Sequence, residues 1–158
     1  MRLSKFILIL IGISLMTACG KDDEGLSYDE QLAVDIEIID AYLADNNIAA
    51  EVHSSGFRYV IHNEGTGGTP NDYDEITVNY EGRFLSSGNV FDSNDDITFQ
   101  LYSLINAWRF ALPLIKEGGS MTIYAPSGLC YGPQGFPQAG IPANANMIFK
   151  LDLIEIVE

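Results

Sequence analysis

Apolar residues recur with a helical spacing in the segment that follows Ser27. They stand at positions i, i+4, i+7 and i+11, which share one face of a helix: Leu32, Ile36, Ile39 and Leu43. Ser27 and Glu30 fit a capping box at the start of this segment. Asn46 and Asn47 favour a stop at its end. The pattern predicts one amphipathic helix from Tyr28 to Asp45.

The apolar face of this helix needs a partner that shields it from water. The helix can pack on the domain that follows, or it can pair with the same face of another chain. We expect the first arrangement, because one isolated helix with a short apolar face forms a poor dimer interface.

After Gly56 the pattern changes to that of β-strands. Alternation or a strand-forming composition marks five segments: 57–62, 76–81, 97–101, 121–125 and 147–157. The apolar residues from Ser103 to Ile115 return to a helical spacing, and Pro113 should disturb that helix near its end. A loop rich in glycine and proline fills Pro126 to Pro142. Strands around one short helix predict an α+β fold with an antiparallel sheet.

The first twenty residues have the pattern of an export signal. Two positive charges precede an apolar run from Phe6 to Leu15, and small residues then lead to Cys19. The run is shorter than the roughly 20 apolar residues that a membrane-spanning helix needs. Because the cysteine directly follows residues of the cleavage type, the segment resembles a bacterial lipobox. We expect residues 1–18 to be a lipoprotein-type signal peptide and the thiol of Cys19 to be acylated.

Lipidation would hold the protein at a membrane of the cell envelope, on the periplasmic or surface face of the outer membrane. The alternative is an ordinary signal peptide with an incidental cysteine. Residues 19–27 form an acidic tether, which fits either a surface-export signal or a solvated spacer. The rest of the chain divides into a helix with its linker, residues 28–52, and one β-rich domain, residues 53–158.

Composition narrows the function classes. The chain has 8 Lys and Arg against 22 Asp and Glu, so a nucleic-acid partner is not expected, because phosphate contacts need clustered basic residues. A hydrophobic content of 47% predicts a packed core. Cys19 and Cys130 cannot pair if the first is acylated, so Cys130 should act as a small apolar residue. Neither His53 nor His62 has metal-ligand spacing, so no metal ion or cofactor is expected.

Five blocks of the β-rich region occur in an order typical of one family. They are VNYEG at 78–82, FDS at 91–93, LINAW at 104–108, YGPQG at 131–135 and IPANA at 141–145. Together they resemble the FKBP-type peptidyl-prolyl isomerases from Gly56 to Glu158. The ordered set is far more specific than any single block, because aromatic residues on alternating strand positions are core residues in most proteins.

The resemblance implies a twisted antiparallel sheet wrapped round a short helix within residues 53–158, with an apolar pocket between them. By matching motif positions, it implies four catalytic residues: Tyr80, Phe91, Asp92 and Tyr131. It implies seven substrate-binding residues: Phe99, Leu104, Ile105, Trp108, Phe136, Ile141 and Phe149. Ile97 and Phe99 compete for one pocket-facing place on their strand.

The implied activity is cis-trans isomerisation of X-Pro peptide bonds in unfolded or proline-containing exported proteins. Rotation about a peptide bond has a barrier of about 18–20 kcal/mol, because resonance keeps the amide planar. An apolar, water-poor pocket that favours the twisted amide lowers this barrier without a nucleophile. Trp108 would lie under the proline ring, Asp92 would either accept hydrogen bonds or face the twisted carbonyl, and Tyr131 would donate a hydrogen bond. Macrolides that bind FKBP pockets are further candidate ligands.

Two other functions remain open from the sequence. A catalytically weak FKBP-like binding module or chaperone for proline-containing segments fits Ala107, where the family usually has glycine. It also fits the flap from Gly135 to Ile141, which is one residue longer than usual. A ligand-capturing surface lipoprotein rests only on the anchor and the acidic tether. The retained aromatic and polar residues of the pocket favour the enzyme.

Overall fold

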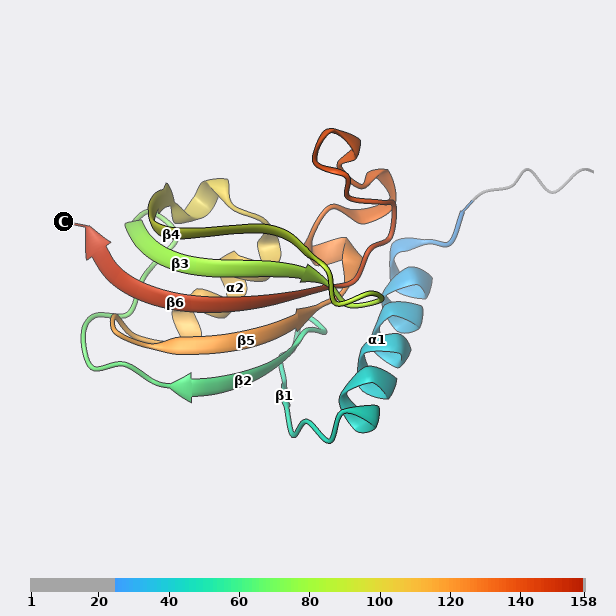
Figure 1. Ribbon diagram of the computed structural model, residues 1–158, viewed down its shortest axis with the longest axis horizontal. Coiled ribbons are helices and arrows are strands. Elements are labelled where there is room, and N and C mark those ends of the chain that lie inside the picture. Colours follow the sequence, from blue (N-terminus) through green and yellow to red (C-terminus); the bar gives the residue numbers. More distant parts are fainter. Residues whose placement is uncertain (1–24, 158) are drawn as a thin grey trace, which may run out of the picture.

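The computed structural model describes residues 25–157, so the predicted signal peptide, Cys19 and most of the tether lie outside the described residues. Within them, the elements follow the order α1 Tyr28–Asp45, β1 Glu51–Val52, β2 Arg58–Asn63, β3 Glu75–Phe84, β4 Val90–Gln100, α2 Asn106–Ala111, β5 Ser120–Ala125 and β6 Met147–Val157 (Figure 1). The strands form one antiparallel sheet in the order β1-β2-β5-β6-β3-β4. The predicted α+β fold is confirmed. The sheet begins at Glu51, two residues before the predicted start of the β-rich domain.

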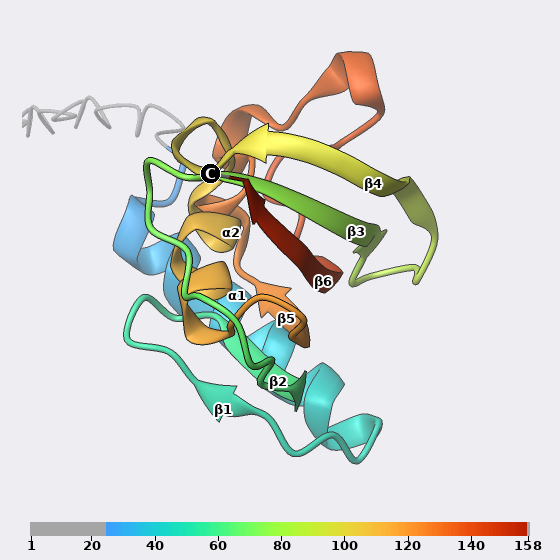
Figure 2. The ribbon, with the colours of Figure 1, turned by 90° about the vertical axis from the view of Figure 1, so that its left-hand side faces the viewer.

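The core lies between the sheet and α2, and the strands curve past that helix (Figure 2). Alternate residues of the central strands face α2 and are fully shielded from solvent, including Val78, Ile123 and Leu151. This alternation places every second residue of a strand in one layer, as the sequence pattern predicts. Trp108 is 5% exposed and joins this cluster from the helix.

Two β-bulges bend β4 against β3. The first lies at Asn79, which stands opposite both residues 95 and 96. There the backbone N–H of Asp96, at a left-handed φ of 51°, donates to Oδ1 of Asn79 at 2.8 Å. The second bulge follows Gly82 and leaves Phe91 as the extra residue on β4. An extra residue locally increases strand twist and bend, so the two bulges curve this edge of the sheet toward α2.

The helix predicted from Ser103 to Ile115 is shorter than its apolar spacing suggests. Only Asn106–Ala111 is α-helical, and 3-10 turns at 101–103 and 112–114 flank it. Pro113 lies in the second turn, where the missing N–H and the fixed φ of proline end the α-helix, as expected. Leu101 belongs to the first turn rather than to the strand that its alternation predicts, and it is fully buried there.

The predicted bounds and capping box of α1 are confirmed. The backbone N–H of Glu30 donates to Oγ of Ser27, and the N–H of Ser27 donates to Oε2 of Glu30. Helix α1 crosses the end of the sheet where β3 and β5 finish and β6 begins (Figure 1). There Ile39 and Leu43 pack against Leu85, Tyr124 and Ile148. The helix therefore packs on its own domain, as expected.

The face that α1 buries differs from the predicted apolar stripe. Leu32 and Ile36 are only half-buried, whereas Asp35 is 1% exposed. A carboxylate sits on this face because Ser127 and Gln31 supply hydrogen bonds to it. Among residues 25–157, no helix is long and apolar enough to cross a membrane.

Replacing Ile39 by Ala should lower the free energy of unfolding by about 2–5 kcal/mol, because the side chain is fully buried between α1 and the sheet. The matched control is Ile38→Ala, one residue away on the same helix and 47% exposed, which should change stability by no more than about 0.5 kcal/mol. Urea unfolding measures both. Equal losses in the two variants would show that α1 does not pack on the sheet in solution.

Candidate active site

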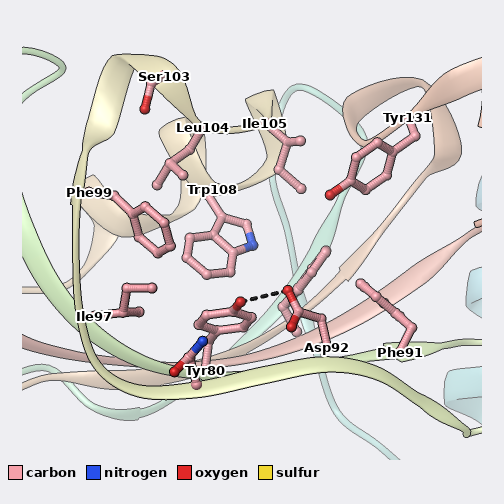
Figure 3. Close-up of a pocket in the computed structure, with 12 residues that line it drawn as sticks. Tyr80, Phe91, Asp92, Ile97, Phe99, Ser103, Leu104, Ile105, Trp108 and Tyr131 are labelled. Carbon is pink, nitrogen blue, oxygen red and sulfur yellow. Dashed lines mark hydrogen bonds between the residues drawn. The ribbon is translucent and has the colours of Figure 1, made fainter. Parts of the chain in front are cut away.

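A cavity of about 500 Å³ opens between the inner face of β3, β4 and β6 and the helix α2 (Figure 3). It is lined by Tyr80, Phe91, Asp92, Asn94, Ile97, Phe99, Ser103, Leu104, Ile105, Trp108, Tyr131 and Phe149. Nine of the eleven predicted catalytic and substrate-binding residues are in this lining. Most of these side chains are aromatic or aliphatic, and Asp92 is the only carboxylate among them.

Trp108 projects from α2 into the middle of this set (Figure 3). Three rings meet it nearly edge-on, with centroid distances of 5.0 Å for Tyr80, 5.6 Å for Phe149 and 6.3 Å for Phe99. Edge-to-face contacts of this kind suit the opposite charge distributions of ring edges and faces. The buried indole N–H has no hydrogen-bond partner within residues 25–157. Trp108 is thus held by ring contacts rather than by a polar anchor.

The bulges of β4 explain which of its residues reach the cavity. In a regular strand, neighbours point to opposite faces. The bulge after Gly82 lets the neighbours Phe91 and Asp92 both line the cavity. A Cβ atom at Gly82 would lie 2.6 Å from Cζ of Phe91, so only glycine leaves room for that ring. The residue types at 82 and 91 are therefore coupled.

The bulge at Asn79 determines which other residues of β4 face the cavity. Ile97 and Phe99, which compete for one place in the sequence interpretation, both line the cavity, because they lie two residues apart on the same face. Asn94 reaches the cavity from the other side of this bulge, and sequence reasoning missed it. Ser103 was also missed, and its place in the turn before α2 was the only available signal.

Tyr80 and Asp92 form the polar pair of the cavity. The phenol of Tyr80 donates to Oδ2 of Asp92 at 2.6 Å, shown as a dashed line in Figure 3. Burial first, and the neighbouring carboxylate second, raise the pKa of Tyr80 to about 12. Tyr80 therefore keeps its proton at neutral pH and fixes the orientation of the carboxylate.

Besides the indole N–H of Trp108, two further hydrogen-bond donors of the lining have no partner within residues 25–157. The phenol of Tyr131 has no partner there, and burial raises its pKa, so it stays protonated. Its ring stacks on Phe136 with an interplanar angle of 3°. The carbonyl of Ile105 accepts from the first turn of α2, whereas its own N–H has no partner among these residues. Both donors are available to a ligand.

Phe136 and Ile141 are not among the residues that line the cavity. Their backbones form two mutual hydrogen bonds that close the loop between them. Ile141 is 2% exposed and packs in the core, while Phe136 is 44% exposed and stacks on the ring of Tyr131. Their predicted contact with substrate therefore depends on how this loop meets a bound chain.

Cys130 precedes Tyr131 in the chain and is not among the residues that line the cavity. Burial raises the pKa of the Cys130 thiol, which packs half-buried against the core as a small apolar residue, as expected. Within residues 25–157 there is no group of three or more His, Cys, Asp or Glu side chains placed to hold a metal ion. The arrangement can bind an apolar ring and direct a few hydrogen bonds at a polar group beside it.

Comparison with known proteins identifies the family. A family model described as FKBP-type peptidyl-prolyl cis-trans isomerase matches residues 67–154, more than half of the chain. The peptidyl-prolyl cis-trans isomerase Mip of Coxiella burnetii is 40% identical over 115 residues, or 70% of this chain. The chain therefore belongs to the FKBP-type peptidyl-prolyl cis-trans isomerase family, and the resemblance of its five sequence blocks is confirmed.

Two further relatives widen the comparison. The outer membrane protein MIP of Legionella longbeachae is 37% identical over 125 residues, or 74% of this chain. The crystal structure of FkpA from Escherichia coli has a TM-score of 0.70 at 28% identity, covering 81% of this chain and 62% of that one. This chain spans about half the length of the two Mip proteins, 49% and 52%.

The stability of the protein should fall more steeply with alkaline pH when Tyr80 is present. In the folded chain Tyr80 holds its proton to about pH 12, whereas an unfolded tyrosine loses it near pH 10. Deprotonation thus favours unfolding as the pH rises from 10 to 12. Urea unfolding across this window should show a smaller fall for Tyr80→Phe than for the wild type. Tyr73→Phe, at an 84% exposed position, controls for the substitution itself. If the free energy of unfolding falls with pH as steeply in Tyr80→Phe as in the wild type, the raised pKa of Tyr80 is wrong.

Proposed function

We propose that this chain catalyses the cis-trans isomerisation of X-Pro peptide bonds in exported, unfolded or proline-containing proteins. The observation that carries the proposal is one cavity that combines the edge-packed indole of Trp108 with the hydrogen-bonded pair of Tyr80 and Asp92. The family to which the chain belongs is named for the same reaction.

The proline ring is the group that the apolar part of the cavity suits. It would lie against Trp108, with Phe99 and Phe149 beside it, and its burial removes apolar area from water. Binding the ring in this way leaves the preceding amide near the polar pair. The substrate is then oriented without any covalent step.

Rotation is favoured because the planar amide is the more polar form. Its resonance places negative charge on the carbonyl oxygen, and the barrier of about 18–20 kcal/mol reflects the loss of that resonance. A carboxylate such as Asp92, facing the carbonyl oxygen, disfavours the planar form more than the twisted one. An apolar wall has the same effect, because it solvates the polar form poorly. Tyr80 keeps the carboxylate in place.

The free donors complete the proposed site. The phenol of Tyr131 and the N–H of Ile105 would donate to substrate carbonyls on either side of the rotating bond. Each such hydrogen bond contributes about 1 kcal/mol net. Macrolides of the FKBP-ligand type, which present an apolar ring beside carbonyl groups, are proposed as competing ligands.

The proposed location is the cell envelope, with a lipid anchor at Cys19. Its support is the lipobox-like sequence before Cys19 and the name of the Legionella longbeachae relative, an outer membrane protein. The anchor would keep the cavity near newly exported chains. Domain bounds of 1–18, 19–27, 28–52 and 53–158 are part of the same proposal.

The decisive test follows isomerisation of a set of short X-Pro peptides by residues 20–158, with and without an FKBP-directed macrolide. Uncatalysed exchange takes tens to hundreds of seconds, so acceleration is easily seen. Acceleration that the macrolide abolishes establishes both the reaction and the cavity. Tight peptide binding without acceleration would instead establish the binding module that the sequence leaves open.

Asp92→Val and Tyr131→Phe should each lower kcat/KM by about 5- to 10-fold, because each removes one interaction of about 1 kcal/mol at the cavity. Both variants should keep the fold, as judged by circular dichroism. The matched controls are Asp152→Val, on an exposed strand position that is not in the lining, and Tyr73→Phe. Unchanged turnover in both cavity variants would refute the assigned roles.

Cys19→Ser should release the protein from the membrane fraction, since the proposed acyl chains supply its membrane affinity. Cell fractionation followed by immunoblotting measures the change. Ser27→Ala, in the helix cap at the end of the tether, serves as the control and should remain in the membrane fraction. If Cys19→Ser keeps the wild-type distribution, the lipid anchor is wrong.

A further inference from the structure

We propose that Asp35, on the N-terminal helix α1, is a positioning residue for the active site, and that it acts through Ser127 on the placement of Tyr131. The proposal rests on the proposed isomerase function and extends it to an element outside the cavity. No residue of α1 lines the cavity, so any effect of Asp35 on the reaction must pass through other residues.

The carboxylate of Asp35 makes a close contact with the start of the loop that carries Tyr131. Its Oδ2 accepts from the Oγ hydroxyl of Ser127 at 2.6 Å and from the backbone N–H of Ser127 at 2.8 Å. Its Oδ1 accepts from Nε2 of Gln31 at 2.8 Å. Asp35 is 1% exposed and Ser127 is fully buried. These bonds join residues 92 positions apart in the chain.

The buried carboxylate has no salt-bridge partner within residues 25–157. Burying a charge costs free energy unless hydrogen bonds compensate, and an apolar side chain at such a position is often as stabilising or more so. The next contact of α1 along the helix, between Ile39 and the sheet, is apolar. A carboxylate at position 35 therefore provides directed hydrogen bonds to three defined donors rather than extra packing.

Ser127 is fixed from a second side. Its backbone N–H also donates to Oδ1 of Asn146, at 3.0 Å, just before β6 begins. Its carbonyl accepts from the N–H of Cys130 at 2.9 Å, which closes a 3-10 turn over residues 127–129. Cys130 follows this turn and directly precedes Tyr131. A short chain of hydrogen bonds thus runs from Asp35 to the residue next to a cavity donor.

A displacement of Ser127 would move this turn as a unit and carry Tyr131 with it. Catalysis by orientation is sensitive to such shifts, and a misplacement of about 1 Å can cost on the order of 100-fold in rate. Loss of the Asp35 contact should therefore weaken the hydrogen bond from Tyr131 to the substrate. It should leave the contacts of Trp108 with the proline ring largely in place.

The test uses the full chain with Asp35→Asn, which keeps the size of the side chain but replaces one acceptor oxygen by a donor. The matched control is Asp40→Asn on the same helix. Asp40 accepts two hydrogen bonds from Arg58, of 2.7 and 2.8 Å, and forms none with the loop within residues 25–157, so its loss weakens α1 without affecting Ser127 directly. Thermal unfolding measures the loss of stability in each variant. The two losses show how much of any change in rate is due to general destabilisation of α1.

We expect Asp35→Asn to lower kcat/KM by about 3- to 10-fold, the loss of up to one hydrogen bond, while Asp40→Asn stays within 2-fold of the wild type. A double-mutant cycle with Tyr131→Phe then separates positioning from general destabilisation. If Asp35 acts through the phenol of Tyr131, Asp35→Asn should have no further effect in the Tyr131→Phe background. The proposal would be overturned if the effects of Asp35→Asn and Tyr131→Phe on kcat/KM multiply in the double variant. It would also be overturned if Asp35→Asn and Asp40→Asn lose the same fraction of kcat/KM.

A binding measurement keeps this test independent of turnover. Trp108 is the only tryptophan of the chain and lines the cavity, so its fluorescence reports the binding of a proline-containing peptide. If the wild type binds but does not accelerate exchange, the proposed isomerase function fails. The same double-mutant cycle on Kd then decides the role of Asp35. If Asp35→Asn does not fold, Ser127→Ala, which removes only the hydroxyl donor, takes its place, and an unchanged Kd and kcat/KM would overturn the proposal.

Discussion

The indole of Trp108 must be enclosed by the sheet while one side of it stays open to a ligand, and most of the fold follows from that requirement. A flat sheet would not reach round a helix of only six residues. The two bulges of β4 bend the sheet edge toward α2, because each inserts an extra residue into one strand. The bulge after Gly82 also brings Phe91 and Asp92 to one face, so curvature and the placement of Asp92 share an origin.

The cavity is chemically sparse, and this suits the reaction of its family. Rotation of an amide needs no nucleophile, so aromatic walls, one oriented carboxylate and the unpartnered donors of Tyr131 and Ile105 are sufficient. The hydrogen bond from Tyr80 keeps Asp92 in a fixed direction. The carboxylate of Asp92 is therefore oriented before a ligand binds, and no binding energy is needed to orient it.

Helix α1 packs across the end of the sheet where β3 and β5 finish and β6 begins (Figure 1). Its apolar residues Ile39 and Leu43 bind it to β5 and β6, while Asp35 and Asp40 direct it toward one loop and one strand. The apolar contacts supply most of the stability, because hydrophobic burial scales with area. The hydrogen bonds of Asp35 and Asp40 determine the position of the helix relative to the sheet. The helix can thus support the site without entering it.

The sequence by itself determined the fold class, the bounds of α1 and nine of the lining residues, because helical and strand periodicities are local properties and five family blocks survive in order. It did not find Asn94 or the partnership of Asp35 with Ser127. Strand alternation predicts that every second residue faces the same side of the sheet. A β-bulge reverses which residues face that side, and a bulge forms only when the strand pairs with its neighbour. A contact across 92 residues likewise exists only once the chain is folded. Local spacing therefore determined the elements, and tertiary pairing decided which side chains meet at the cavity.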